Sequence, residues 1–267
     1  MVHRFLIIGL LVLGGCTSSL PDLRIPTALG EALPTSNIPI KSLAAQLTGP
    51  LPDNSKTTSD LYLRSFEALI FTTEWGAKND YIRKWNIAPI SYRVYDGAHQ
   101  RLKMAISDTA AMLSDIAGLE IQGAIKTKGN IRIQPNIFSD TSYICGFSFY
   151  ERKYLSGMLS DWFLGDGTIR QTEIYVSSNL EEKTNVTFEE CAFEEMSQIL
   201  GIWNDADVVK HSKWRNRIAD KSKRLTWHDA IILRTLYDFR IKPGMHKDQA
   251  LPIAKVIIKE LLDELNS

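Results

Sequence analysis

The stretch of the chain that most restricts its fold runs from Thr187 to Asp205 and reads TFEECAFEEMSQILGIWND. Thr187, followed three residues later by Glu190, forms a capping-box pattern that satisfies the first free amides of a helix. Apolar residues recur after it at helical spacing and predict a buried face: Ala192, Met196, Ile199 and Leu200. Gly201 comes next, where a left-handed turn is expected to end the helix.

A polar stripe runs beside this apolar face. Glu190, Glu194 and Gln198 fall at successive i, i+4 positions, so their side chains are expected to line one side of the helix. The stretch therefore predicts an amphipathic helix that carries several carboxylates and carboxamides and closes on a glycine turn.

Further helices and strands can be placed around this motif helix. Periodicity predicts helices over residues 61–71, 101–118 and 225–237 and a last one from about Pro252, with strands over residues 90–95, 119–121, 130–134 and 168–176. Trp75 and Trp85 are predicted to lie in the core, because tryptophan is more often a packing residue than a cofactor platform. This order predicts an α+β fold with helices packed on one mixed sheet.

The first residues have the organisation of an export signal. A basic start, His3-Arg4, precedes a short apolar run, and Leu13-Gly14-Gly15-Cys16 resembles the lipobox of bacterial lipoproteins. The resemblance implies a signal peptide over residues 1–15, cleavage before Cys16 and lipid attachment to that cysteine. The alternative is an ordinary or uncleaved signal in which Cys16 is incidental. Thr17, in place of an aspartate, resembles the signal for outer-membrane sorting and implies an envelope protein that faces the periplasm.

Residues 16–57 are rich in proline, serine and threonine, which favours a flexible tether that lifts a folded domain, residues 58–267, away from the bilayer. The formal net charge of the chain is +0, so no overall attraction to nucleic acid is implied, and an exported lipoprotein is not expected to bind nucleic acid. Any charged partner must meet a local patch.

The frame from Glu194 to Asn204 resembles the pattern H-E-x-x-H-x-x-G-x-x-H of the metzincin-type zinc proteases, which belong to the zincins. Gly201 holds the glycine position and Glu195 the general-base position, while Glu194, Gln198 and Asn204 stand where the three histidine ligands would be. The resemblance implies a zincin-like domain that lacks the zinc-binding histidines.

Three other segments make the chain still more similar to an uncharacterised family of secreted bacterial lipoproteins that carry a domain of unknown function. These segments are Asn204-Asp205, Leu236-Tyr237-Asp238 and Lys242-Pro243-Gly244-Met245. Met245 would correspond to the methionine turn beneath the metal of metzincins, although Pro-Gly independently predicts a turn and the methionine is expected to pack there.

The departures from the protease pattern bear on the chemistry. Catalytic zinc needs three strong ligands and an open position for water, whereas Glu194, Gln198 and Asn204 form an oxygen-rich set that suits a hard cation better. We therefore expect no zinc and no other cofactor. Glu195 as a general base has little to act on without an activated water.

Histidine could restore a metal site, but His99, His211, His228 and His246 form no i, i+4 pair. Each is predicted to be a surface or helix-capping residue, with His228 in the first turn after a cap at Thr226. A long-range site that joins Glu194 to His211 stays open.

Two further groups of residues are candidates for a role. Cys145 and Cys191 remain once Cys16 is lipidated, and they are either a disulfide or two separately buried thiols. A basic patch could contact anionic lipid headgroups, lipopolysaccharide phosphates or an acidic partner, or could be a solvated surface. It consists of Lys210, Lys213, Arg215, Arg217, Lys221, Lys223 and Arg224.

Three functions are compatible with these observations. The first is a non-catalytic binding or scaffolding role in the envelope, in which the cleft around Glu194, Glu195, Gln198 and Asn204 holds an envelope protein, a peptide or a glycan. The second is a peptidase-like hydrolase with an unconventional site centred on Glu195, with or without a hard metal. The third is a structural lipoprotein whose cleft has no function.

Overall fold

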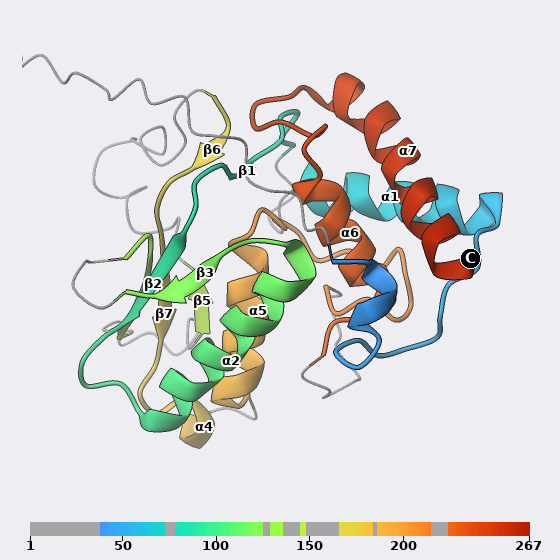
Figure 1. The fold of residues 1–267 in the computed structure, drawn as a ribbon. Coiled ribbons are helices and arrows are strands. Elements are labelled where there is room, and N and C mark those ends of the chain that lie inside the picture. Colours follow the sequence, from blue (N-terminus) through green and yellow to red (C-terminus); the bar gives the residue numbers. More distant parts are fainter. Residues whose placement is uncertain are drawn as a thin grey trace, which may run out of the picture.

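The computed structural model describes residues 38–72, 78–124, 129–135, 145–147, 166–183, 186–214 and 224–267. Within these ranges a sheet and two groups of helices share one hydrophobic core (Figure 1). The signal peptide, Cys16 and Trp75 lie outside the described residues, whereas Trp85 is fully buried, as predicted. None of the helices in the described part of the chain is long and apolar enough to cross a membrane.

The main sheet has five strands in the order β3-β2-β4-β7-β5. Neighbours pair in parallel except β5, which runs antiparallel to β7 at one edge. The strands are β2 (Ile90–Val94), β3 (Ile121–Gly123), β4 (Ile131–Pro135), β5 (Cys145–Phe147) and β7 (Thr172–Val176). A separate parallel pair joins β1 (Lys84–Trp85) to β6 (Thr168–Ile169). The predicted mixed sheet is confirmed, although the strand predicted over residues 168–176 is divided into β6 and β7.

The register of β4 and β7 separates the two faces of the sheet. Ile133 lies opposite Ile174, and both are buried beneath the helices. Arg132 lies opposite Glu173 on the other face, where the two side chains form an ion pair. The alternation of apolar and polar residues along these strands thus turns one face of the sheet toward the core.

Two helices cover that apolar face. They are α2 (Gln100–Ala117) and α5 (Phe188–Gln198), and they pack side by side, with the one-turn helix α4 (Leu180–Lys183) nearby (Figure 1). Helix α2 ends, as predicted, at Gly118, whose φ of 68° allows the left-handed turn that closes a helix.

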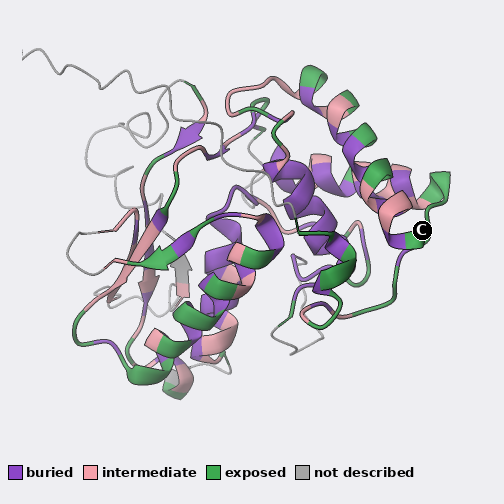
Figure 2. Ribbon diagram, viewed as in Figure 1, coloured by how far each residue is buried: buried purple, intermediate pink, exposed green. Residues whose placement is uncertain are grey.

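A second group of helices packs beyond α2. It comprises α1 (Lys56–Ile70), α6 (Trp227–Tyr237), α7 (Lys247–Asn266) and the 3-10 helix η1 (Ile40–Leu43). Every residue of α6 is buried, and Figure 2 shows it enclosed, while α2 and α7 keep exposed faces. Helix α7 begins at Lys247 with His246 as its N-cap, so the start predicted near Pro252 is wrong and the proline lies inside the helix.

Part of the predicted tether belongs to the folded body. Ile40, Leu43 and Leu47 are buried in the core, and the Ile40 amide donates to Glu264 Oε1 at 2.8 Å. Thr48 pairs with Thr226 ahead of α6. The ordered domain therefore starts before residue 58, because apolar residues between the prolines give this segment enough surface to bury.

Candidate functional site

The motif helix forms as its sequence predicts. Thr187 Oγ1 accepts a hydrogen bond from the Glu190 amide at 3.1 Å, and Glu190 Oε2 accepts one from the Thr187 amide at 2.8 Å. The regular helix ends at Gln198, and Gly201 follows with a φ of 107°. The predicted capping box and glycine turn are confirmed.

Glu195 faces the edge of the sheet. Its side chain is 5 % exposed, and Oε1 lies 3.6 Å from Cys145 Sγ at the start of β5. Cys145 and Cys191 form a disulfide, with their Cα atoms 5.9 Å apart, so the alternative of two separate thiols is wrong. The disulfide joins β5 to α5 beside Glu195.

The other motif positions are held by contacts within the protein. Gln198 is buried, and its Nε2 donates to Asp205 Oδ1 at 3.5 Å. Asn204 Nδ2 donates to the carbonyl of Ala68 near the end of α1 at 3.0 Å. Glu194 is half-buried. Across the described ranges, no group of three His, Cys, Asp or Glu side chains is placed to hold a metal ion.

Gly201 of the motif, Gly167 before β6 and Gly244 let backbone segments approach one another unusually closely. A Cβ atom on Gly201 would lie 2.4 Å from the carbonyl oxygen of Arg83, ahead of β1. A Cβ atom on Gly167 would lie 2.2 Å from the amide of Gly244, and the Ile82 amide donates to Met245 O at 2.9 Å. The turn predicted at Lys242-Pro243-Gly244-Met245 therefore holds the segment before β1 in place through its backbone hydrogen bonds with Ile82.

A buried array of polar groups lies between α1 and α6. Ser65 Oγ lies 2.9 Å from His228 Nε2, and His228 Nδ1 lies 3.0 Å from Asp229 Oδ1. The order resembles a nucleophile, a base and an orienting acid. All three residues are at most 2 % exposed, so a substrate cannot reach Ser65 in this conformation. The array joins two helices of the core. His228 lies in the first turn after the Thr226 cap, as predicted, but it is buried, so a surface position for it is wrong.

The carboxylate of Asp229 is the acidic group of this array and accepts hydrogen bonds from several neighbours. Burial alone would raise the pKa of its carboxyl, but the hydrogen bond and charge of His228, together with bonds from Thr226 and Ser212, outweigh burial and hold the pKa below its ordinary value of 3.8. The only sequence signal for this residue was its place three positions after Thr226, which forms a second capping box.

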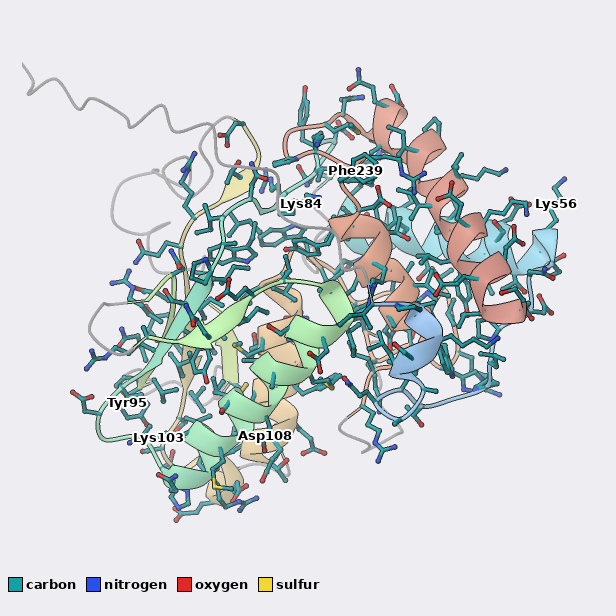
Figure 3. The ribbon with its side chains drawn as sticks, viewed as in Figure 1. Lys56, Lys84, Tyr95, Lys103, Asp108 and Phe239 are labelled. Carbon is teal, nitrogen blue, oxygen red and sulfur yellow. A yellow bond between two sulfur atoms is a disulfide. The ribbon has the colours of Figure 1, made fainter. Side chains whose placement is uncertain are left out.

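Lys84 is a second buried charge that the sequence did not single out. Its Nζ donates to the carbonyl of Leu236 at 2.8 Å, at the C-terminal end of α6, where a cation is favoured by the helix dipole. Burial, with a smaller effect of Lys242, lowers the pKa of Lys84 to about 7. Figure 3 shows Lys84 at the junction between β1 and the helices.

The predicted basic patch is only partly described. Lys210 and Arg224 are exposed, whereas Lys213 is 4 % exposed and its amide donates to Asp229 Oδ2, so its assignment to a surface patch is wrong. The remaining members, Arg215, Arg217, Lys221 and Lys223, lie outside the described residues. His99 and His246 accept helix N-terminal amides, which confirms their capping role, and His211 is exposed.

Comparison with known proteins gives one family. A search of the curated proteins finds none that matches the chain. Residues 60–256, which include the motif helix, the Gly201 turn and the Pro243-Gly244 turn, match the family described as "Protein of unknown function (DUF2927)". The chain therefore belongs to the DUF2927 family.

Proposed function

We propose that this protein is a lipid-anchored component of the bacterial cell envelope whose zincin-like domain binds a partner without catalysing a reaction. The anchor would be Cys16, and Thr17 favours the outer membrane with the domain facing the periplasm. The partner would be an envelope protein, a peptide or a glycan held at the surface beside α5, where Glu194 is the half-buried member of the motif.

The observation that carries the non-catalytic role is the hydrogen bond from Asn204 Nδ2 to Ala68 O. It directs the side chain at the third ligand-equivalent position toward α1. Gln198, at the second position, is buried and paired with Asp205. Turning both side chains toward a shared cation would break these contacts and leave a carbonyl unsatisfied, which typically costs about 1–3 kcal/mol.

Support for a zincin-like arrangement comes from the position of Glu195. The residue lies on a capped helix that ends in a glycine turn, beside strand β5, which runs antiparallel to β7 at the edge of the main sheet. This is compatible with the fold implied by the motif spacing, while the carboxamides at two ligand positions argue against zinc chemistry.

The test combines elemental analysis with binding. The mature protein, purified without chelator, would be compared with the Glu194→Ala/Gln198→Ala double variant for bound metal and for hydrolysis of peptide and glycan libraries. We expect no metal that depends on these residues and no hydrolysis, with binding of a library member weakened by Glu194→Lys but not by Glu120→Lys on the surface after α2. Stoichiometric metal lost in the double variant, or hydrolysis abolished by Glu195→Gln, would favour the hydrolase instead.

The anchor is tested separately by replacing Cys16 with serine. Because a thiol is needed for lipid attachment, we expect Cys16→Ser to move the protein from the membrane fraction to the soluble fraction when cells are fractionated. Thr17→Ser is the matched control and should stay with the membranes. If Cys16→Ser is retained on membranes to the same extent as the wild type, the lipoprotein assignment is wrong.

A further inference from the structure

A groove between α2 and α5 lies on a different face of α5 from the motif residues. It is a cavity of about 310 Å³ lined by Met104, Ala105 and Met112 of α2 and by Phe193 of α5, with polar groups at its rim. Glu189 and Phe193 are four residues apart and share one face of α5, whereas Glu194 and Gln198 share another. Occupation of this groove therefore does not depend on what the motif residues do.

The floor of the groove is apolar and adaptable. Met104 is 55 % exposed, and Met112, about two turns further along α2, is half-buried. Methionine side chains are flexible and polarisable, and they recur on surfaces that accept apolar segments of different shape. A groove between two helices accommodates the apolar face of a third helix.

The rim of the groove is acidic. Arg101 is its one cation, and it already pairs with Glu181 at 2.7 Å and with Glu189 at 2.9 Å. Asp108, which Figure 3 labels on α2, has no salt-bridge partner in the part of the chain that the structure describes. The groove is thus lined by two carboxylates, those of Asp108 and Glu189, against one guanidinium, and Glu181 just outside the lining adds a third negative charge. The net charge at the rim is negative, which favours a cationic partner.

From this floor and this rim we propose that the α2–α5 groove is a docking surface for a basic amphipathic helix of another protein. The apolar face of that helix would cover Met104, Met112 and Phe193, and its lysine or arginine side chains would meet Asp108 and the carboxylates around Arg101. The inference extends the binding role proposed above to a second surface.

The experiment uses the mature protein with its methionine methyl groups labelled for NMR. The probe is a synthetic helix with leucine on one face and lysine on the other, and the control peptide keeps the leucine face but carries glutamate. We expect the lysine peptide to shift the Met104 and Met112 methyl signals saturably, while the Met245 signal stays in place. The shifts should weaken with added salt, because the contact is partly ionic.

Charge-reversal variants decide whether the rim is responsible. Asp108→Lys is expected to weaken binding of the lysine peptide by at least about tenfold, whereas Glu120→Lys, which changes the net charge equally, should leave it unchanged. Equal binding of both peptides, or shifts that avoid Met104 and Met112, would overturn the proposal. Shifts of these methyl signals with protein concentration alone would show a contact between copies of this chain instead. Metal binding or hydrolysis at Glu195 would alter none of these results.

Discussion

Replacing Gly201 with alanine is expected to lower the free energy of unfolding by about 3–5 kcal/mol. The residue has a φ of 107°, a backbone conformation that L side chains rarely adopt, and its Cβ would lie 2.4 Å from the carbonyl oxygen of Arg83. Since that oxygen belongs to the backbone, it cannot rotate away as a side chain could. Urea-induced unfolding followed by circular dichroism would measure the loss.

Gly49→Ala is the matched control for this substitution. Gly49 also has a positive φ, 81°, but the nearest atoms to an added Cβ are 3.8 Å away, on Thr226. It therefore isolates the backbone strain, for which we expect about 1–2 kcal/mol. If the two variants lose equal stability, the close approach of Arg83 does not determine the effect of Gly201, and the motif glycine is needed only for its turn.

The elements that sequence predicted well are those in which a local signal and a tertiary contact agree. The box at Thr187 and Glu190 sets the start of α5, Gly118 sets the end of α2, and Trp85 is buried as its size suggests. In each case the residues that determine the feature are neighbours in sequence or carry a strong intrinsic preference.

The charged groups of the core could not be assigned in this way. A buried Lys84 reads in sequence like any surface lysine, and only the fold shows that its Nζ reaches the end of α6. The basic run around Lys213 predicts a surface patch for the same reason, yet Lys213 is buried beside Asp229. Composition gives the charge of a residue, but long-range packing decides its solvation.

In the candidate site, too, local sequence signals predict some features, whereas others depend on long-range packing. Spacing alone brought Glu194, Glu195 and Gln198 onto adjacent faces of one helix, and the structure keeps that order. The contact of Asn204 with Ala68 joins residues that are far apart in the chain, and no local pattern predicts it. The array of Ser65, His228 and Asp229 likewise depends on the packing of α1 against α6.

Three buried charged side chains lie on or against helix α6, which is itself buried along its whole length. Asp229 lies in its first turn, Arg234 lies in its last turn, and Lys84 donates to the carbonyls of Leu236 and Asp238 at its C-terminal end. The Arg234 guanidinium donates to the carbonyls of Asp115 and Ile116 at the end of α2 and to Ile38 O. Burial lowers the pKa of this arginine. Each charge thus satisfies backbone groups that the surrounding core would otherwise leave without partners.

Asp229→Asn is expected to lower the free energy of unfolding by about 3–5 kcal/mol, since it removes a buried charge from its hydrogen-bond partners. Oδ1 accepts from Ser212 at 2.8 Å and lies 3.0 Å from His228 Nδ1, while Oδ2 accepts from the Lys213 amide at 3.0 Å and from both the amide and the hydroxyl of Thr226. An amide group in place of either oxygen would face several donors. Asp248→Asn, in the exposed first turn of α7, is the matched control and should cost well under about 1 kcal/mol.

The pH dependence of stability gives the same prediction a second measurement. Because the pKa of Asp229 in the folded protein lies below 3.8, its contribution is fully present above that pH and is lost as the pH falls through the folded-state pKa. Acid unfolding of the wild type should therefore steepen below about pH 3.8, and the corresponding slope should be smaller in Asp229→Asn. If the variant and the wild type lose stability in parallel on acidification, the carboxylate is not ionised in the core, and the array from Ser65 to Asp229 would be held together by neutral hydrogen bonds.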